Sequence, residues 1–562
     1  MNGIQAFLEV LTAAGVDRIF GNPGTTELPL NDALVTDPRF DYVLGVHEIP
    51  VVGMADGYAM ATRQIAVINL HIACGLGNAM GMLYNAHIEG TPLLLTAGQQ
   101  DRRLSLAQPV LWGELTRLVQ PWTKWAYEVQ RPEDIATATR RAIQIALTPP
   151  TGPVFLALPV DVQTSEFVAD EIPWKPTELA TRVRPDRQAI ERVAECLGSA
   201  RRPIILAGSR VTESGQGDET IACDHLASLA ELLDATIVTE ATSSHGRLPL
   251  DSSHPLYGGR LPLWSNDIRS LLEPHDVVLA IGLDLFRLYI HDDAGESPFD
   301  VDKLWIHLDS NAAQLAKNFP VQHAVLGDIE IMLDELLGEI RARHPMNEAK
   351  RQRLAERRQV RADDMEQWNR NVTEQWDITP IPPEVLMAAI IRALPEDAAV
   401  VEEAVTTHRN LLELCGVIRN PQRFFSHRGW ALGWGIGCSL GVQMAWPQTP
   451  VIGIIGDGAA LYGIQGLWTA ARYGIPVVFV ICNNRQYKIL KECSQKMPLP
   501  RFEKNEYLGM DLDEPEIDFV KLSESFGVAA KRVTSADQVV EELTSAFARR
   551  EPFLLDVAIS DE

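Results

Sequence analysis

Short apolar runs alternate with helical stretches along almost the whole chain, and this alternation limits the folds open to it. In the first 162 residues the runs VDRIF, YVLGV, IAVINL, PLLLTAG and PVFLALP are separated by stretches such as IPVVGMADGYAMATR. Strands that alternate with helices predict βαβ units and a parallel sheet. The pattern restarts at RPIILAG and again at AAVVEEA. The sequence therefore predicts an α/β protein with three doubly wound parallel-sheet domains.

Two segments of different composition separate the three blocks. A Pro- and charge-rich stretch at about 172–187 is typical of a linker, and 339–376 is charge-dense and helical in character. We therefore place the domains at 1–180, 181–345 and 346–562. The total length of 562 residues agrees with this division, since domains have roughly 100 to 200 residues each.

Composition and charge exclude several classes of partner. Hydrophobic residues make up 46% and charged residues 22% of the chain, as in an ordinary globular protein. The 50 Lys and Arg against 75 Asp and Glu leave a net charge of −25, which repels nucleic acid and anionic membranes. We expect no nucleic-acid partner and no membrane partner.

Cysteine usage and the start of the chain indicate the compartment. The seven cysteines are scattered and form no CxxC pair, so neither a disulfide framework nor a zinc site is indicated. The first residues lack the basic region of a signal peptide, and no apolar run approaches the roughly 18 residues of a membrane span. We expect a cytoplasmic protein.

The most informative stretch is VIGIIGDGAALYGIQGLWTAARYGIPVVFVICNN. Asp457 follows one apolar strand, and Asn484 follows the next strand, 27 residues further on. A right-handed crossover places both at the carboxyl edge of one parallel sheet, where α/β folds bind ligands. Their oxygens suit Mg²⁺, and Gly456 and Gly458 let the backbone approach phosphate groups at a helix N-terminus. The stretch predicts a diphosphate–Mg²⁺ site, although each half alone is also typical of an ordinary turn.

Three side chains of the N-terminal block also follow apolar strands. They are Thr25, Glu48 and His71, and a parallel sheet brings all three to one edge. Taken singly, each has an ordinary structural explanation as a turn residue, a helix N-terminal carboxylate or a strand-end histidine. Taken together, they are our candidate catalytic residues.

The stretch from GDG to NN resembles the signature of the thiamine diphosphate-dependent decarboxylase and acetohydroxyacid synthase superfamily. The motifs GNPG, ADGYA, NLH, GNAMG and TAGQQ look like the pyrimidine-binding domain of benzoylformate decarboxylases, and the resemblance continues through GPVFLALPVDV, DVVLAIG and LGWGIGCSLGVQMA. It implies a pyrimidine, a central and a diphosphate domain, with the cofactor bound between the pyrimidine domain of one subunit and the diphosphate domain of another. A homodimer or homotetramer is therefore expected.

The resemblance also implies cofactor-binding residues. Metal binding would fall to Asp457, Asn484 and a backbone carbonyl at Gln486, and Glu48 would lie against the aminopyrimidine ring, where thiamine chemistry needs a carboxylate. Leu432 would support the bent cofactor, although plain core packing would need the same apolar side chain. The remaining cofactor-binding candidates are Thr406, Gly456, Gly458 and Ala459.

The substrate residues agree with the family in part. Thr25 takes the place of a serine that binds the substrate carboxylate, and His71 that of a histidine that assists substrate addition and proton transfer, which favours a 2-keto acid. Tyr289 stands where relatives have a second active-site histidine. Ile489 and Cys493 replace a small and an aromatic residue, so the substrate pocket is expected to differ in shape.

A second departure lies in the segment SHRGWALG. It carries His427, Arg428 and Trp430 where benzoylformate decarboxylase has small residues. We consider two roles for them: binding a polar or anionic substituent of the substrate, or supporting the loop.

These observations favour a non-oxidative decarboxylase of a 2-keto acid that releases CO₂ and an aldehyde. The alternatives are a thiamine diphosphate-dependent carboligase or acyloin lyase and an acetohydroxyacid synthase-like transferase. Thiamine diphosphate and Mg²⁺ are the expected cofactors, FAD is not expected, and the partner is a small-molecule 2-keto acid or aldehyde. We disfavour a non-enzymatic binding protein, because such a protein would not need Glu48, Asp457 and Asn484 in the same chain.

Overall fold

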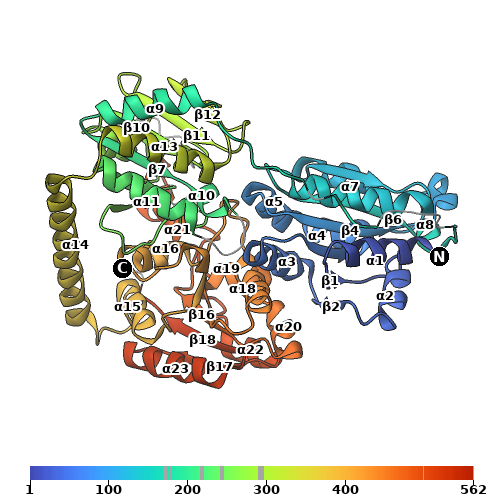
Figure 1. Cartoon of the computed structure of the whole chain (residues 1–562). Coiled ribbons are helices and arrows are strands. Elements are labelled where there is room, and N and C mark those ends of the chain that lie inside the picture. Colours follow the sequence, from blue (N-terminus) through green and yellow to red (C-terminus); the bar gives the residue numbers. More distant parts are fainter. Residues whose placement is uncertain are drawn as a thin grey trace.

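The computed structural model confirms the predicted fold class. Its three six-stranded sheets contain only parallel strand pairs, and each sheet lies within one of the predicted domain ranges. We name the three domains by the roles that the resemblance implies, and Figure 1 shows the first of them, the pyrimidine domain, as a separate lobe beside the central and diphosphate domains. The structure describes residues 1–168, 174–177, 179–215, 220–240, 246–288, 297–497 and 499–560.

The pyrimidine domain has helices on both faces of its sheet. Its central strands are buried along their whole length, which explains their continuous apolar sequences. The strands are, in order across the sheet, β2 (Asp41–Leu44), β1 (Arg18–Asn22), β3 (Ala66–Leu70), β4 (Leu93–Gln99), β6 (Val154–Pro159) and β5 (Trp125–Glu128). The helices are α1 (Gly3–Ala13), α2 (Leu28–Val35), α3 (Glu48–Thr62), α4 (Ile72–Asn78), α5 (Met80–Glu89), α6 (Leu115–Val119), α7 (Ile135–Leu147) and α8 (Val160–Thr164).

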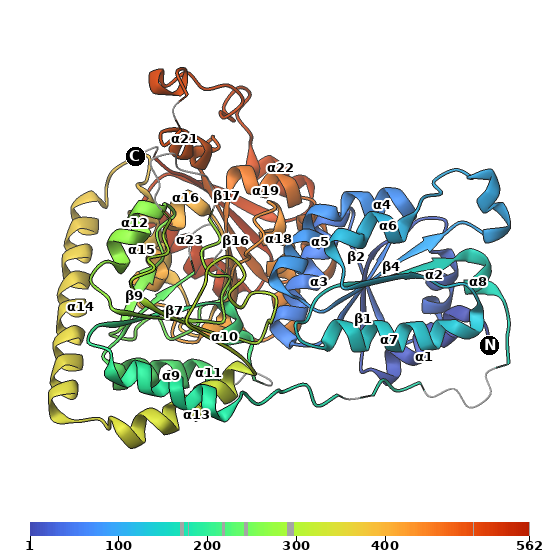
Figure 2. The same ribbon diagram turned by 90° about the horizontal axis from the view of Figure 1, so that it is seen from above.

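The central domain has a strand order that reverses between β7 and β10. Its strands are β12 (His323–Leu326), β11 (Leu304–Asp309), β10 (Val277–Ile281), β7 (Pro203–Ala207), β8 (Thr236–Thr239) and β9 (Tyr257–Arg260). Its helices are α9 (Arg187–Ser199), α10 (Ser209–Glu213), α11 (Ile221–Leu233), α12 (Ser265–Leu272) and α13 (Ile329–Arg343). The long polar helix α14 (Glu348–Gln375) then runs along the outer side of the molecule toward the third domain (Figures 1 and 2).

The diphosphate domain contains the predicted GDG and NN segments at the ends of neighbouring strands. Its strands are β14 (Phe424–Phe425), β13 (Ala399–Glu403), β15 (Val451–Gly456), β16 (Val477–Asn483), β18 (Phe553–Ala558) and β17 (Ala529–Val533). Its helices are α15 (Pro383–Ala393), α16 (Val405–His408), α17 (Leu411–Leu414), α18 (Trp434–Ala445), α19 (Asp457–Gly463), α20 (Gly466–Tyr473), α21 (Lys488–Ser494), α22 (Phe519–Ser525) and α23 (Ala536–Arg549).

The pyrimidine and diphosphate domains share one hydrophobic core where α3 meets α18 (Figure 2). The helices approach closely at glycines: a Cβ on Gly441 would lie 2.0 Å from the Met54 carbonyl oxygen, and one on Gly57 would lie 2.4 Å from that of Cys438. The Trp434 indole also donates a hydrogen bond of 2.6 Å to Asp56. Because α3 begins at Glu48, this packing holds the first turn of α3, with Glu48, close to the diphosphate domain.

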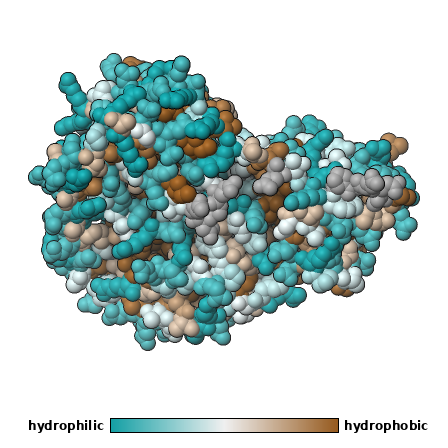
Figure 3. Space-filling model, in the orientation of Figure 1, coloured by the Kyte–Doolittle hydropathy of each residue, from teal (hydrophilic) through white to brown (hydrophobic). Residues whose placement is uncertain are grey.

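The outer surface agrees with the acidic composition. In Figure 3 polar side chains cover most of the visible face, and apolar side chains gather only in small patches. In the part of the chain that the structure describes, no helix is both long and apolar enough to cross a bilayer.

Candidate active site

The structure brings the three predicted metal-binding residues together in one loop region at the carboxyl edge of the third sheet. Strands β15 and β16 pair in register, so the residues that follow them are neighbours. The Asp457 carboxylate accepts hydrogen bonds from the amides of Gly458, at 2.8 Å, and Arg485, at 2.6 Å. The Asn484 side-chain oxygen accepts one from the amide of Gln486 at 3.1 Å.

The Asp457 carboxylate is buried, with 5% of the residue exposed. Burial raises its pKa to about 6, and the groups that chiefly oppose this rise are backbone amides rather than a basic side chain. A buried carboxylate without a neutralising side chain is a favourable ligand for a cation, and a carboxylate, an amide oxygen and a backbone carbonyl are hard donors. The residues present therefore fit a Mg²⁺ ion.

The two glycines of the GDG segment differ in what surrounds them. A Cβ on Gly458 would lie 2.6 Å from the ring of Tyr487, so this position needs glycine because an aromatic ring packs against it. A Cβ on Gly456 would meet only the carbonyl oxygen of Glu403, at 3.7 Å, which leaves open space beside the strand end. Only Gly456 thus leaves the room that we predicted for a phosphate group.

The other predicted cofactor residues surround the same edge. Ala459 is buried in the first turn of α19, and Thr406 is half-buried in α16, directly after β13. Leu432 is half-buried and packs against the core shared with the pyrimidine domain. Glu403 lies in the same region, but its carboxylate has a structural role. It accepts hydrogen bonds of 2.8 to 3.0 Å from three backbone amides at the start of α18.

Glu48 is held between two asparagine side chains. One of its carboxylate oxygens accepts a hydrogen bond from Asn22 at 2.9 Å, and the other accepts one from Asn78 at 3.0 Å. The residue is 5% exposed and begins α3. A Cβ on Gly75 would lie 3.0 Å from the Glu48 carboxylate, so no larger residue fits there without movement. The carboxylate is thus fixed in one orientation.

His71 lies at the same edge and pairs with a buried carboxylate. Its Nδ1 lies 2.8 Å from an oxygen of Glu27, whose side chain is fully buried. Glu27 also accepts hydrogen bonds from the backbone amides of Gly24, at 3.0 Å, and Gly98, at 2.7 Å, so it is held in place by the surrounding loops. Because a carboxylate accepts hydrogen bonds, this contact favours the imidazole tautomer with its proton on Nδ1.

The two threonines before Glu27 have different environments. Thr25, the predicted substrate-binding residue, is exposed at the tip of the loop. Thr26 is buried, donates a hydrogen bond of 2.9 Å to Glu27 and lies 3.4 Å from His71 Nδ1. Thr25 is therefore placed to meet a ligand, whereas Thr26 belongs to the support of His71.

The predicted substrate-pocket residues do not share one environment. Ile489 is half-buried and Cys493 buried on the short helix α21, which follows the metal loop. His427 is 5% exposed, and its Nδ1 accepts a hydrogen bond of 2.9 Å from the amide of Trp430. These contacts favour the loop-supporting role for His427. Tyr289 lies outside the described residues.

Sequence reasoning missed three residues that the structure places in the site. Glu27, Asn22 and Asn78 orient His71 and Glu48. Asn22 lies in GNPG and Asn78 in GNAMG, which we had noted for another reason, and Glu27 lies two residues after the candidate Thr25. A polar residue next to a strand end was the only local signal. Its partner comes from another loop of the sheet edge and is not visible in the sequence.

Comparison with known proteins agrees with this geometry. Three family models match: the N-terminal thiamine pyrophosphate binding domain at residues 1–117, the central domain at 190–336 and the C-terminal thiamine pyrophosphate binding domain at 405–557. The chain belongs to the thiamine pyrophosphate (thiamine diphosphate) enzyme family.

Relatives within this family include decarboxylases and synthases. The chain is 32% identical to benzoylformate decarboxylase of Pseudomonas aeruginosa over 557 residues, 98% of either protein. It is 29% identical to a probable acetolactate synthase large subunit of Methanocaldococcus jannaschii, covering all of this chain and 92% of that protein. Among solved structures, the 4-hydroxybenzoylformate decarboxylase of Rhodococcus jostii has a TM-score of 0.85 at 29% identity, with both chains fully covered.

Proposed function

We propose that this protein is a non-oxidative thiamine diphosphate-dependent decarboxylase that converts a 2-keto acid and a proton into CO₂ and an aldehyde. The observation that carries the proposal is the His71–Glu27 pair beside the clamped Glu48. A decarboxylase must deliver a proton to the carbon that loses CO₂, and a histidine whose Nδ1 is fixed by a buried carboxylate and whose side chain is 19% exposed is suited to that task.

The chain's own side chains have distinct roles in this proposal. Bound thiamine diphosphate supplies the electron sink that accepts the electron pair left by CO₂. Asp457, Asn484 and the Gln486 carbonyl would hold Mg²⁺ against its diphosphate. The Glu48 carboxylate would exchange a proton with the aminopyrimidine nitrogen, and its two asparagine donors keep it aimed. His71 would move the substrate proton through Nε2.

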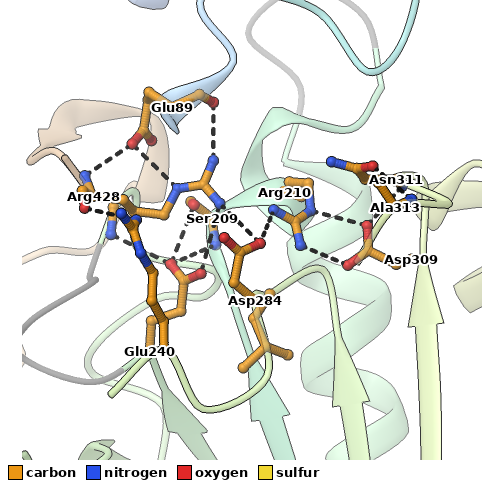
Figure 4. A network of polar contacts seen from close by, with 12 residues as sticks. Glu89, Ser209, Arg210, Glu240, Asp284, Asp309, Asn311, Ala313 and Arg428 are labelled. Atoms are coloured by element: carbon orange, nitrogen blue, oxygen red, sulfur yellow. Dashed lines mark hydrogen bonds and ion pairs between the residues drawn. The ribbon is translucent and has the colours of Figure 1, made fainter. Parts of the chain in front are cut away.

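The second candidate is an acetolactate synthase-like transferase, and the central domain is where a dinucleotide such as FAD would bind. Doubly wound sheets bind dinucleotides where the strand order reverses, here between β7 and β10. At this point Arg210 pairs with Asp309 and Asp284 at 2.8 Å each, and Glu240 accepts hydrogen bonds from Ser209 (Figure 4). These paired charges line an open cavity of about 600 Å³ and do not fill it, so they leave the absence of FAD a prediction from the sequence, which the colour of the purified protein tests.

A panel of 2-keto acids tests the proposal. Purified protein with thiamine diphosphate and Mg²⁺ would be given benzoylformate, 4-hydroxybenzoylformate, pyruvate and branched aliphatic keto acids, with CO₂ and aldehyde measured in parallel. Stoichiometric CO₂ and aldehyde from at least one acid supports the decarboxylase. CO₂ accompanied by a coupled hydroxyketo acid instead of the aldehyde supports the synthase, and a yellow protein that releases FAD would point the same way.

We also propose a homodimer or homotetramer in a reducing cytoplasm. The seven cysteines are all unpaired, which fits a reducing compartment. The loop after β4 exposes apolar side chains, with Leu106 at 98% and Val110 at 80% exposure, a feature of interaction surfaces. Analytical ultracentrifugation tests the assembly, and a monomeric active enzyme would contradict it.

A further inference from the structure

The two short helices α16 and α17 connect the diphosphate edge to the central domain. They follow β13, whose end pairs with the end of β15, the strand before Asp457. Thr406, a predicted contact of the diphosphate, lies in α16. Thr406 and Asp457 belong to the diphosphate domain of one chain, so this edge is the same whichever subunit supplies the pyrimidine domain.

The backbone between the two helices is strained. Arg409 and Asn410 have φ values of 43° and 52°, so two successive residues other than glycine adopt the left-handed conformation. This conformation is unfavourable for a residue with a Cβ, and it persists only where the surrounding structure holds it. Contacts on either side of these two residues must therefore fix the segment.

The central domain holds the far end of the segment through a buried ion pair. The Arg260 guanidinium, at the end of β9, donates a hydrogen bond to the carboxylate of Glu413 in α17, and the two side chains are 6% and 0% exposed. His408 Nε2 lies 3.1 Å from the other carboxylate oxygen. Burial alone would raise the pKa of Glu413, but Arg260 and His408 hold it at about 2, so the carboxylate is charged at neutral pH.

A second arginine reinforces this anchor. Arg361 of α14 donates hydrogen bonds to the backbone carbonyls of Glu413 and Leu414, at 3.3 and 3.2 Å. It also donates to the carbonyls of His254 and Tyr257 in the central domain, at 3.2 Å each. Because the N–H groups of a guanidinium are fixed in one plane, these bonds lock the end of α17 against the start of β9.

At the near end, Arg409 connects α16 to α21, the helix that begins two residues after Gln486. Its Nε donates a hydrogen bond to the Thr406 carbonyl at 2.9 Å, and its Nη2 donates one to Glu492 of α21 at 3.3 Å. The position of α16 is therefore set between an anchor in the central domain and the helix that follows the predicted metal-binding residues.

We propose that Arg260 and Glu413 are positioning residues that hold the strained segment 405–414 and keep Thr406 at the diphosphate edge, so that cofactor affinity depends on an ion pair outside the diphosphate site. The inference rests on the proposed function, because it takes Thr406 as a contact of the diphosphate. A segment without its anchor would leave the left-handed conformation, and only the fraction of molecules that keep it would bind at full affinity.

Two matched pairs of variants test the anchor and the strain. Glu413→Gln removes the charge that faces Arg260, and Asp309→Asn is its control, because Asp309 is also fully buried but pairs with Arg210 of the central domain. Asn410→Ala and Asn410→Gly remove the same side-chain amide, but only glycine adopts a positive φ at no steric cost. Melting temperatures show whether each variant is folded, and the Asn410 pair decides the question if Glu413→Gln does not fold.

The readout is the dissociation constant of thiamine diphosphate at saturating Mg²⁺, measured by isothermal titration calorimetry. Inorganic pyrophosphate with Mg²⁺ is a second ligand, which needs no pyrimidine domain. We expect Glu413→Gln to weaken the binding of both ligands on the order of tenfold, the range of one lost charge-assisted hydrogen bond. Asn410→Ala should bind both ligands about fivefold more weakly than Asn410→Gly. Asp309→Asn should lower the melting temperature and leave both dissociation constants at the parent value.

Parent-like affinity in folded Glu413→Gln, or equal affinity in the two Asn410 variants, would overturn the inference. An equal loss of affinity in Asp309→Asn would also overturn it, because the effect would then follow from lower stability alone. A parent protein that binds neither ligand would instead remove the proposed function.

Discussion

Replacing Asp457 with asparagine tests whether the protein without ligands holds a destabilising buried charge at the proposed Mg²⁺ site. The pKa of Asp457 is about 6 in the folded chain, against an ordinary value of 3.8. The folded state therefore binds this proton more tightly than the unfolded state, and the free energy of unfolding falls as the pH rises from about 4 to 7. At about 1.4 kcal/mol per pKa unit, the charged carboxylate costs about 3 kcal/mol at pH 7.

Asp457→Asn removes this charge at little change in shape. It also gives up one acceptor, because the amide of Arg485 would face an amino group instead of a carboxylate oxygen. That loss costs about 1 to 2 kcal/mol. The unloaded variant should then be about 1 to 2 kcal/mol more stable than the parent at pH 7, and the difference should vanish or reverse near pH 5, where the parent carboxyl is protonated.

Urea unfolding of chelator-treated protein at pH 5 and at pH 7 measures the difference in free energy of unfolding between variant and parent at each pH. The pH dependence that comes from all other titratable groups is the same in both proteins and drops out of this difference. Adding Mg²⁺ with thiamine diphosphate should then stabilise the parent by about 2.7 kcal/mol at a hundredfold excess over the dissociation constant, and the variant far less. A variant that is less stable than the parent at both pH values would refute the buried-charge argument. Equal stabilisation by the ligands would refute the metal assignment.

Three further substitutions test the pyrimidine edge. Glu48→Gln should keep fold and cofactor affinity but lose more than about 10²-fold in kcat, because an amide cannot exchange the proton; unchanged hydrogen–deuterium exchange at C2 of the bound cofactor would contradict this. His71→Ala should bind cofactor normally and lose on the order of 10² in kcat/KM for the best keto acid, about 2.7 kcal/mol, whereas activity within a few-fold of the parent would contradict it. Gly24→Ala should lower kcat/KM in the same way without weakening cofactor binding, because the new Cβ would lie 1.9 Å from His71 Nδ1; a parent-like rate would show that the ring position is not critical.

The strands that the sequence predicted and those it missed differ in where they lie. The interior strands β3, β4, β6, β15 and β16 are buried on both faces and therefore appear as continuous apolar runs. The predicted runs of the first domain lack β5, which lies at the edge of its sheet; β5 and the edge strands β9, β12 and β17 of the sheets carry exposed or half-exposed residues. An edge strand needs no apolar run because one side of it faces solvent, so composition alone did not reveal it.

The contacts in the candidate site also fall into two groups, those that follow from a single βαβ unit and those between distant loops. Spacing along single βαβ units was sufficient to place Asp457 beside Asn484, because a parallel crossover fixes which strand ends become neighbours. The bonds from Asn22 and Asn78 to Glu48, and from Glu27 to His71, join loops 26 to 44 residues apart. Which side chains meet across such loops depends on backbone directions that no local pattern encodes.

The sequence by itself determined the fold class and the meeting of the GDG and NN segments at one sheet edge, and it supplied the candidate metal and acid–base residues, because hydrophobic period and strand-end position are local properties. Only the tertiary structure decided the role of Arg428. Its sequence neighbours allowed either a substrate contact or a structural one, and its partner Glu89 lies 339 residues away in another domain. A buried charge needs a countercharge, and the packing of the three domains determines where that countercharge is found.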